Sequence, residues 1–494
     1  MHAVNKIAAA WAAVLLSPAL LSPVLLSACK ASTLATSSLQ SSQSSQNSDQ
    51  TNVSPSKPTA TPGEPKTSTA GNNSQPDPLF PNRKHGWSEI STNDRHRADQ
   101  FADRYIHHLN RGKTPRRFLT ELAEIARSRG AADIRDNKNK NKTFGYRVEF
   151  GGDAGVFFRR GLAKVTEGLS IIVVSIDAPR LELKQFPTFE SEGFGMLQTK
   201  LHGELEWRSW MVYPMALDIY LARPGHRPTS IVIGQAPNDV VLSIPDLLPH
   251  LSRGRGNVDH PERLDPIGAA TPAALADRLA KLGVNSSDFA VAEAYLVPAT
   301  RAHRIGVDRG LIGGYGQKNR ALAFTAIRAL ADTKTPKHSI VVVVLGRSES
   351  KQPGRSGTSY VGRALRDTIA QLASAPAPDI YFTQQVLSAS AAWVGTAVET
   401  GQNQGIALGL AKADALPGIG RKVSDMLDRA NVQFHWIGKG RRSEYSARAI
   451  ATLNLDALTV AIPSTGHGTP GQIISVLDLF QGYQACVAWF SASN

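Results

Sequence analysis

The sequence of 494 residues is poor in cysteine: it contains two, Cys29 and Cys486. Two cysteines allow at most one intramolecular disulfide, and they exclude a zinc site built from four cysteines. The fold must therefore be stabilised by packing rather than by cross-links. Because 41% of its residues are apolar, a chain of this length can bury at least one large core.

Acidic residues are the minority among the charged side chains. There are 41 Asp and Glu against 55 Lys and Arg, which gives a formal net charge of +14 and a sequence pI of about 9.8. This excess favours acidic partners such as nucleic acid, anionic lipid or wall polymers. Because the basic residues are spread along the chain, a solvated basic surface is the simpler interpretation.

Large apolar residues are almost missing between position 31 and Leu79, where Ser, Thr, Gln, Asn and Pro dominate. Such a composition cannot bury enough surface to offset the entropy lost on ordering. We therefore predict a disordered tether over residues 29–85, which would hold a folded domain away from its point of attachment.

The segment before this tether resembles an export signal. Lys6 precedes an apolar run from Ile7 to Leu26, which ends in the sequence Leu-Ser-Ala-Cys at Cys29. This pattern is typical of bacterial lipoproteins and predicts a signal peptide over residues 1–28, with lipid attached to Cys29. The implied location is the cell envelope, periplasmic or on the cell surface. An ordinary cleaved signal or an uncleaved anchor is the alternative.

From Asp94 onward, helical and strand-like segments take turns. The buried strand-like runs include "LSIIVVSID", "SIVVVVLG" and "LDALTVAIP", and helical segments such as "ALAFTAIRALAD" and "YVGRALRDTIAQLAS" lie between them. We also interpret "DIYFTQQVL" as a strand and "GRKVSDMLDRANV" as a helix. This alternation predicts an α/β fold, in which a central mixed sheet has helices on both faces.

The character of the sequence changes in the middle of this pattern. Residues 187–298 contain strand-like pieces, Pro-containing loops and one helical segment, "PAALADRLAKLG". We predict that they form a smaller β-rich domain inserted into an α/β domain of residues 86–186 and 299–494. Ligands of open α/β sheets bind beyond the carboxyl ends of the strands. The positions to inspect are therefore Ser175 to Asp177, Gly346 to Ser350, Ser388 to Ala391, and Pro463 to His467.

These segments resemble the aspartyl aminopeptidase and aminopeptidase I family of zinc metallopeptidases, bacterial branch. "SIDAPRLELKQFP" is similar to its His-x-Asp-Ser-Pro-Arg-Leu-x-Leu-Lys stretch, and "GGYGQKNR" to its Gly-Ala-Tyr-Gly-Gln-Asp-Asp-Arg. "GRSESKQPGRSGTSY" is similar to the stretch that begins Asp-Lys-Glu-Glu-Ile-Gly-Ser. The resemblance runs in the same order from about Asp94 to the C-terminus. It implies a zinc-exopeptidase-like sheet and an inserted domain of the dimerisation type.

The resemblance also implies the position of each metal ligand. The family holds two zinc ions with His and carboxylate ligands, and a Glu is the general base. The ligand positions fall on Ser175, Lys318 (the bridging carboxylate), Glu349, Ser390 and His467, the last after a one-residue slip that leaves Gly466 as a competitor. The Asp that orients the first His falls on Asp177, and the general base falls on Ser348.

Most of these replacements disfavour a pair of zinc ions. Serine hydroxyls are poor neutral ligands, and Lys318 is a cation where a carboxylate should neutralise two dications. At 4 Å from one zinc ion and an effective dielectric constant of about 20, the repulsion would be roughly 8 kcal/mol. We therefore expect no metal cofactor. We hypothesise that the Lys318 ammonium takes the former metal position and pairs with Asp177 or Glu349.

The sequence then predicts a catalytically inactive pseudo-peptidase that binds a peptide, a wall polymer or a partner protein. The alternative is an active aminopeptidase that removes N-terminal acidic residues with a reduced zinc site of Asp177, Glu349 and His467. The family resemblance implies a homo-oligomer, and the lipid on Cys29 implies contact with a membrane.

Two other patterns are weaker. "LPGIGRKVS" is similar to a helix-hairpin-helix turn and would indicate nucleic-acid binding, but a Gly-rich loop that opens a helix is the simpler interpretation. Nucleic acid is therefore a disfavoured partner. Ser464 and His467 with a distant Asp would form a nucleophilic triad, but no Gly-x-Ser-x-Gly elbow precedes the serine.

Overall fold

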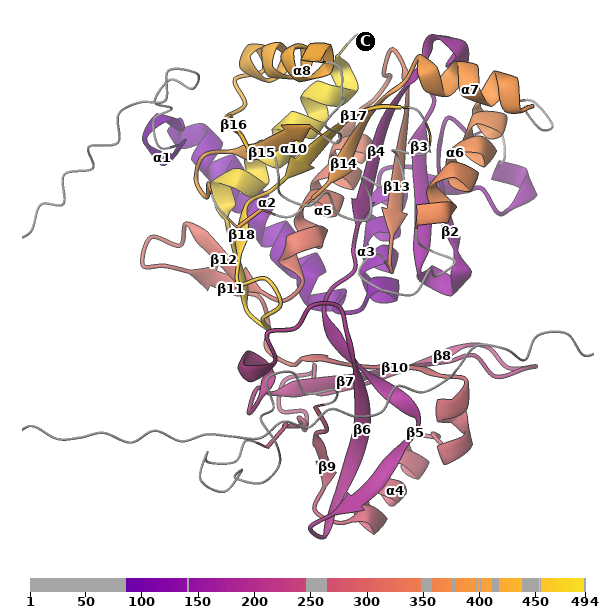
Figure 1. Cartoon of the computed structure of the whole chain (residues 1–494), viewed down its shortest axis with the longest axis vertical. Helices are drawn as coiled ribbons and strands as arrows, with labels where there is room; N and C mark the ends of the chain where they lie inside the picture. Colours follow the sequence, from indigo (N-terminus) through magenta and orange to yellow (C-terminus); the bar gives the residue numbers. More distant parts are fainter. Residues whose placement is uncertain are drawn as a thin grey trace, which may run out of the picture. The chain divides into compact units, whose positions relative to one another are not determined.

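The computed structural model (Figure 1) describes residues 86–139, 142–245, 264–347, 358–374, 379–396, 398–399, 401–410, 417–437, 453 and 455–492. The predicted signal peptide, the tether, Cys29, Ser348 and Glu349 lie outside these residues. Among the described residues, no helix has the length and apolar character needed to cross a membrane.

The α/β domain is built on a nine-stranded mixed sheet. Its spatial order is β1-β2-β3-β13-β4-β14-β17-β15-β16, and the four adjacent strands β13, β4, β14 and β17 run parallel to one another. The strands are β1 (Ala132–Asp133), β2 (Phe144–Glu149), β3 (Ala154–Arg159), β4 (Leu169–Ser175), β13 (Ser339–Leu345), β14 (Ala391–Gly395), β15 (Ile406–Leu410), β16 (Phe434–Trp436) and β17 (Asp456–Ala461).

Helices cover both faces of this sheet, as the alternation of strands and helices predicts (Figure 1). The described helices of the domain are α1 (Gly86–Glu89), α2 (Thr92–Arg111), α3 (Pro115–Arg127), α5 (Gln317–Asp332), α6 (Thr358–Ala373), α7 (Ile380–Ser388), α8 (Pro417–Arg429) and α10 (Val476–Ser491). Two of them start at caps that the sequence provides: Ser91 accepts from the Asp94 amide before α2, and Ser475 accepts from the Leu477 amide before α10.

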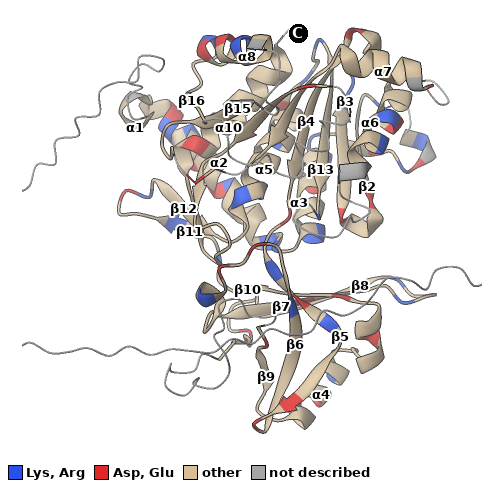
Figure 2. Cartoon of the chain, viewed as in Figure 1, with Lys and Arg blue, Asp and Glu red and all other residues tan. Residues whose placement is uncertain are grey.

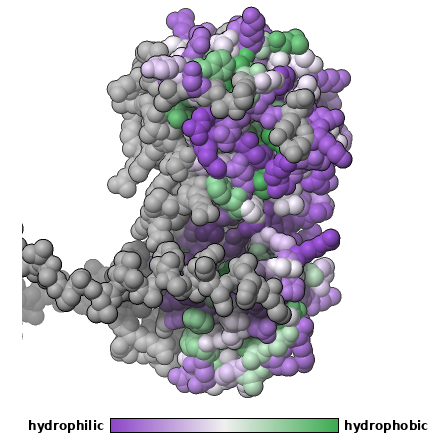
Figure 3. All heavy atoms as spheres, turned by 90° about the vertical axis from the view of Figure 1, so that its right-hand side faces the viewer, coloured by the Kyte–Doolittle hydropathy of each residue, from purple (hydrophilic) through white to green (hydrophobic). Residues whose placement is uncertain are grey.

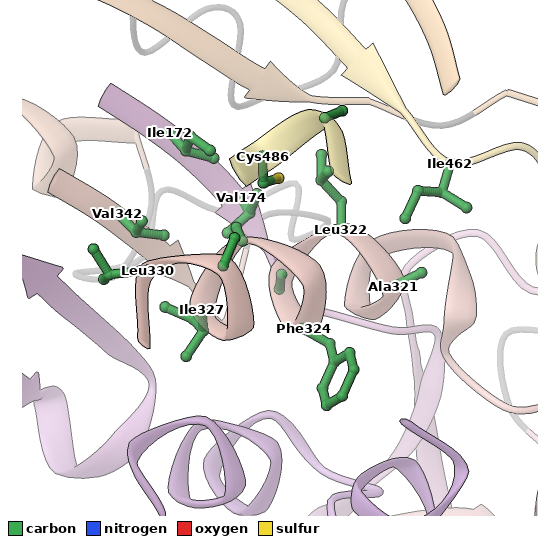
Figure 4. Packing of buried hydrophobic residues seen from close by; sticks show 14 of the residues in the cluster. Ile172, Val174, Ala321, Leu322, Phe324, Ile327, Leu330, Val342, Ile462 and Cys486 are labelled. Carbon is green, nitrogen blue, oxygen red and sulfur yellow. The ribbon is translucent and has the colours of Figure 1, made fainter. Parts of the chain in front are cut away.

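The central strands show how the two faces are filled. Ile172 and Val174 of β4 belong to one apolar cluster together with residues of α2, α3, α5, α8 and α10 (Figure 4). Ile171 and Val173 belong to a second cluster with residues of α6 and α7. Successive strand residues point to opposite faces, so a strand that is apolar at every position must be covered on both sides. This pattern confirms the predicted fold class.

A six-stranded sheet forms the inserted part, in the order β8-β7-β10-β5-β6-β9. Its elements are β5 (Arg180–Ser191), β6 (Phe194–His202), β7 (Met215–Leu221), β8 (Thr229–Ile233), β9 (Ile267–Ala269), β10 (Glu293–Pro298) and the helix α4 (Pro272–Lys281). This sheet begins at Arg180, before the predicted boundary at residue 187. The smaller third sheet has the order β11-β12-β19-β18: β11 (His303–Ile305), β12 (Leu311–Gly314), β18 (Ser464–Thr465) and β19 (Gln472–Ser475).

Lys113 binds the segment through which the chain returns from the inserted sheet to the α/β domain. Its ammonium group is buried and donates to the carbonyl oxygens of Pro298, Ala299 and Thr300 at 2.6, 3.0 and 2.6 Å. All three donors of the ammonium group are used by backbone acceptors. The chain that leaves β10 is thereby fixed next to the start of α3.

Two local predictions differ from the structure. The segment "DIYFTQQVL" forms the helix α7 rather than a strand, because the Asp379 side chain caps it by accepting from the Phe382 amide at 2.7 Å. Gly418 and Gly420 of "LPGIGRKVS", expected in a loop that opens a helix, lie inside the helix α8 itself, so the disfavoured hairpin turn is not formed at these glycines either.

On the face shown in Figure 3, hydrophilic side chains predominate and apolar ones occur in small scattered groups. The single cysteine of the described residues, Cys486, is fully buried, and burial raises the pKa of its thiol to about 12. A buried thiol of this kind is an inert core residue.

Trp87, in the first described helix, is held by a chain of contacts that ends at a buried carboxylate. Trp87 donates from its indole nitrogen to the Asn403 side-chain oxygen at 2.9 Å. The amides of Asn403 and Gly405 donate to the carboxylate of Asp478 at 2.7 and 2.9 Å. Asp478 is fully buried in the first turn of α10, and this burial raises its pKa to about 7, although both amides favour the ionised form.

This raised pKa predicts a stability that falls as the pH rises. Between the unfolded pKa of 3.8 and the folded value of about 7, the folded protein keeps a proton that the unfolded chain releases. The stabilisation that the protonated Asp478 gives to the folded state is therefore complete below about pH 4, and it is lost as the pH rises through 7. Between pH 5 and pH 7, we expect the free energy of unfolding of the wild type to fall by about 2 kcal/mol more than that of Asp478→Asn.

Urea unfolding at pH 5, 6, 7 and 8 measures this effect. Asp456→Asn, which changes an exposed carboxyl at the start of β17, is the control and should keep the wild-type slope. A wild-type stability that does not change between pH 5 and pH 7 would contradict the prediction.

Candidate functional site

The candidate site lies where the parallel strands β13, β4, β14 and β17 end. Leu345 is paired with Ser175, so the last residues of β13 and β4 lie side by side. Thr396 directly follows β14, and its amide donates to the Val460 carbonyl of β17 at 3.0 Å. The carboxyl ends of the four strands therefore lie along one edge of the sheet.

Ser175 ends β4 and is buried, as its place in the apolar run predicts. Its hydroxyl oxygen accepts from the Asp177 amide at 3.0 Å. This is a short local turn of the kind that Ser residues form after a strand. The hydroxyl at the first ligand position therefore serves the backbone of its own loop.

Asp177 is the most highly connected group of the site. Its carboxylate is 1% exposed and accepts from the Arg180 guanidinium at 2.7 Å and from the Ala178 amide at 3.0 Å. His202 Nε2 lies 3.1 Å from both carboxylate oxygens. The Asp177 backbone carbonyl accepts from the Asn319 side chain at 2.8 Å. A guanidinium and an imidazole thus surround the carboxylate.

Arg180 and His202 also share a second carboxylate, that of Glu182. Arg180 Nη2 lies 2.9 Å and His202 Nδ1 3.5 Å from Glu182 Oε1, and Lys200 Nζ lies 3.2 Å from Glu182 Oε2. Burial opposes the charge of Glu182, but Arg180 and His202 outweigh it and hold the pKa of Glu182 below its usual value.

Arg180 is held in place from several sides. It is 1% exposed, and its guanidinium stacks 4.5 Å from the centre of the Tyr295 ring. Burial opposes its charge, yet the carboxylates of Asp177 and Glu182 raise its pKa. Arg180 and His202 face each other across the β5–β6 pair, so the inserted sheet supplies both side chains that contact the Asp177 carboxylate.

Lys318 lies in the first turn of α5. Its amide donates to the Gln472 side-chain oxygen at 2.8 Å, and Gln317 Nε2 donates to the Gln472 carbonyl at 2.6 Å. Gly316 precedes the helix at φ +80°, where a Cβ atom would lie 2.7 Å from Arg320 Nη1. The Lys318 side chain is half-buried. Asn319 links this turn to Asp177, so Lys318 lies next to the candidate site.

His467 follows the strand β18 near the same edge. Its Nε2 lies 2.7 Å from the Ser464 hydroxyl, and its Nδ1 lies 3.5 Å from Glu399 Oε1. The acid beside this pair is thus Glu399 rather than a distant Asp. Ser464 is 1% exposed, which closes its hydroxyl to a substrate. The Ser464–His467 contact therefore fixes the loop that follows β17.

The structure does not bring Ser390 to the other predicted site residues. Ser390 directly precedes β14, and its hydroxyl accepts from the Leu169 amide at the amino end of β4 and donates to the Val386 carbonyl. Ser175 is at the other end of β4, about 20 Å away along the strand. The register places Thr396 at the carboxyl end of β14, so we leave Ser390 out of the site.

The donors near Asp177 do not fit a pair of zinc ions. Within the described residues, no group of three or more His, Cys, Asp or Glu side chains is arranged to hold a metal ion. The Ser175 hydroxyl accepts a hydrogen bond within its own turn. The carboxylate oxygens of Asp177 contact Arg180 and His202. A dication would have to displace two cationic or hydrogen-bonding partners from this carboxylate. Ser348 and Glu349 lie outside the described residues.

The sequence reasoning missed Glu182 and His202 and gave Arg180 no role. Arg180 and Glu182 stand in the quoted "APRLELK" segment, where their alternate spacing puts them on one face of a strand. His202 lies on the partner strand of a hairpin, 22 residues later, and its position follows only from the register Arg180↔His202. No motif in the sequence marks it.

The chain has the mixed α/β fold that the family resemblance implies. A sequence profile of the family described as aminopeptidase I zinc metalloprotease (M18) matches residues 108–350. The probable M18 family aminopeptidase 1 of Thermotoga neapolitana is 30% identical over 304 residues, which cover 58% of this chain and 66% of that protein. The protein of the same name from Thermotoga maritima is 28% identical over 305 residues.

Solved structures agree on the fold. A crystal structure of an M18 family aminopeptidase from Thermotoga maritima has a TM-score of 0.75 and 24% identity, and the match covers 83% of this chain and 99% of that one. The S. cerevisiae mApe1 dodecamer has a TM-score of 0.64 and 15% identity, with 81% and 97% covered. The chain is therefore similar in sequence to M18 family aminopeptidases and shares their fold. The match spans just under two thirds of the length of the curated relatives.

The buried network predicts a large effect of losing Arg180 and a small effect of losing Lys200. Arg180→Met would leave two buried carboxylates without their guanidinium, at a cost of about 3–5 kcal/mol in unfolding free energy. Lys200→Met removes a cation from the same Glu182, but its side chain is 61% exposed, so we expect a loss below about 1 kcal/mol.

Urea denaturation of the two variants compares these losses directly. Equal losses would show that Arg180 does not hold the site together in the way proposed here.

Proposed function

We propose that this chain is a pseudo-peptidase, an M18-fold protein that acts in binding or assembly and does not hydrolyse peptides with two zinc ions. One observation carries the proposal: the Asp177 carboxylate is surrounded by Arg180 and His202 inside the site, and Ser175 hydrogen-bonds to its own turn. Two-zinc hydrolysis needs ionised carboxylates and neutral imidazoles that are free to bind metal.

The charge of the site supports the same proposal. Arg180 supplies positive charge to the Asp177 and Glu182 carboxylates without any metal, and Lys318 lies in the first turn of α5. A peptide could still bind at this site, but no bound hydroxide would be generated there to attack it. The expected partners are a peptide, a wall polymer or another protein, and nucleic acid remains disfavoured.

The second candidate is an active aminopeptidase with a reduced zinc site of Asp177, Glu349 and His467. The names of the curated relatives favour it, since they are probable aminopeptidases. In that case His467 would have to leave Ser464, and one Asp177 oxygen would have to leave Arg180 or His202. The family implies zinc as the cofactor of this alternative.

Metal analysis of the purified protein, combined with hydrolysis of aspartyl- and glutamyl-p-nitroanilide, separates the two candidates. After incubation with zinc and desalting, we expect substoichiometric zinc and no hydrolysis above the rate of the heat-denatured sample. Stoichiometric zinc, with hydrolysis that Glu349→Gln abolishes, would establish the second candidate instead.

We further propose a homo-oligomer, because an assembly of this fold is known as a dodecamer. The inserted sheet offers exposed aromatic side chains that a second copy would cover, since Phe186 is 69% and Phe194 42% exposed. Light scattering on the preparation used for metal analysis gives the mass of the assembly.

We also propose that lipid on Cys29 anchors the protein in the bacterial cell envelope. The basis is the sequence pattern before Cys29 alone. Two acyl chains bind a membrane stably, so the wild-type protein should take up radiolabelled palmitate and sediment with membranes. Cys29→Ser should lose the label and appear in the soluble fraction. Label that persists in Cys29→Ser would contradict the anchor.

A further inference from the structure

The edge of the nine-stranded sheet opposite the candidate site carries exposed apolar and basic side chains. The first residues of β13, β4 and β14 are paired there. β3 is antiparallel to β13 and ends at the same edge with Arg159. The segments that connect these strands therefore lie together at the amino ends of the parallel strands, and α7 lies beside them, at the upper right in Figure 2.

The loop that follows β3 holds the side chain of Leu162 in solvent. Leu162 is 80% exposed. The amides of Leu162 and Ala163 donate to the carbonyl oxygens of Pro336 and Lys337 at 3.1 and 2.8 Å. These hydrogen bonds fix the loop to the segment that enters β13, so the backbone itself sets the position of Leu162.

A second exposed apolar side chain, Tyr381, lies in the first turn of α7 and is 82% exposed. α7 packs against η3 (Val165–Glu167), the short helix that follows the Leu162 loop. Phe382 and Val386 of α7 pack in the apolar cluster on this face of the sheet, so Tyr381 is on the side of the helix that faces solvent. Leu162 and Tyr381 are therefore both exposed next to η3.

Four exposed lysines share this edge and form no ion pair among the described residues: Lys142, Lys164, Lys334 and Lys337. Lys164 follows in the Leu162 loop, and Lys337 is in the segment that binds this loop. The Lys334 carbonyl accepts from Arg159 Nη1 at 3.4 Å, at the end of β3. Lys142 precedes Thr143, whose carbonyl accepts from the Arg160 amide at 2.7 Å.

Fewer carboxylates than cations lie along this edge in the part of the chain that the structure describes. Glu167 Oε1 accepts from the Lys164 amide at 3.1 Å, and Asp379 caps α7. Asp456 opens β17, further along the edge. Arg160 adds a fifth cation to the four lysines, so five positive charges against three negative ones leave an excess of two. This excess has the same sign as the formal net charge of +14.

Single exposed apolar residues are common on protein surfaces, but the combination at this edge fits a lipid surface. Unpaired lysines attract anionic head groups, and leucine and tyrosine bury apolar surface between those head groups. Tyrosine suits this boundary because its ring is apolar and its hydroxyl is polar. An anionic polymer would pair with the lysines but offers no apolar layer to Leu162.

We propose that the amino-end patch (Leu162, Tyr381, Lys142, Lys164, Lys334 and Lys337) binds the surface of an anionic lipid bilayer. Binding through this patch sets the orientation of the molecule. β4 runs from Leu169 at the patch to Ser175 at the candidate site, about 20 Å along the strand. The candidate site then faces away from the membrane and stays open to a partner. The proposal rests neither on the pseudo-peptidase function nor on lipid at Cys29, because the patch consists of described residues alone.

Co-sedimentation with lipid vesicles tests the proposal on residues 29–494 with Cys29→Ser. This chain keeps every described residue and lacks both the apolar run of the predicted signal peptide and the lipid. We expect binding to mixed vesicles of phosphatidylglycerol and phosphatidylcholine that weakens as the NaCl concentration rises, because salt screens surface charges. Binding to pure phosphatidylcholine vesicles should be much weaker.

Two double variants of this chain separate the apolar and the basic contributions. Leu162→Ser with Tyr381→Ser should weaken binding to the mixed vesicles about tenfold or more, because apolar surface is no longer buried. Lys164→Gln with Lys337→Gln should weaken it about thirtyfold, since each lysine near an anionic surface contributes to binding.

Val307→Ser and Lys281→Gln are the matched controls. Val307, between β11 and β12, is the most exposed of the large apolar residues described, and Lys281 is an exposed lysine at the end of α4. Each control should change vesicle binding less than twofold. Every variant should keep the urea midpoint of the parent chain, because the substituted side chains are exposed.

Absence of sedimentation with the mixed vesicles, or equal losses in the patch and control variants, would overturn the proposal. Equally strong binding to pure phosphatidylcholine would also contradict it. Binding to a soluble polyanion such as an RNA oligonucleotide, without binding to vesicles, would assign the lysines to a polymer instead.

Discussion

The ion pair between Asp177 and Arg180 determines what the rest of the candidate site can do. It joins the carboxyl end of β4, in the α/β domain, to the first residue of the inserted sheet. Both side chains are buried, so each charge depends on the other. Breaking such a pair on one side leaves an uncompensated charge, which is far more costly than losing a surface pair. His202 and Glu182 extend the pair into a closed network.

In the proposed pseudo-peptidase, this network would keep the fold of a metallopeptidase without its metal ligands. In a metal site, the ions hold together carboxylates that would otherwise repel one another. Here Arg180 provides positive charge to Asp177 and Glu182, and the His202 ring lies within 3.5 Å of both carboxylates. The hypothesis from the sequence placed this role on Lys318. That hypothesis pairs Lys318 with Asp177 or Glu349, and it stays a prediction because Glu349 lies outside the described residues.

The architecture was predictable because it depends on periodicity. The strands β4 and β13 are apolar at nearly every position, and a strand of this kind has few environments other than the middle of a covered sheet. The segment of α7 was misread as a strand because nine residues rich in apolar side chains fit both structures. Its cap at Asp379 is a short-range signal for a helix, and it decides between them.

The candidate site was predictable only in part, because a ligand set depends on register. Ser175 and Asp177 were placed correctly at a strand end, since both follow one apolar run directly. Ser390 is a predicted ligand position because the sequence around it is similar to that of the family. The parallel pairing of β14 with β4 puts it at the opposite end of the sheet. His202 meets Asp177 through a hairpin pairing, which no local pattern reveals.

The most direct measurement of the central claim is an anomalous difference map at the zinc absorption edge, from crystals grown with excess zinc. The account predicts no anomalous peak within coordination distance of Asp177, and continuous density from its carboxylate to the Arg180 guanidinium. Two adjacent peaks bridged by protein ligands at that place, with Arg180 turned away, would contradict it.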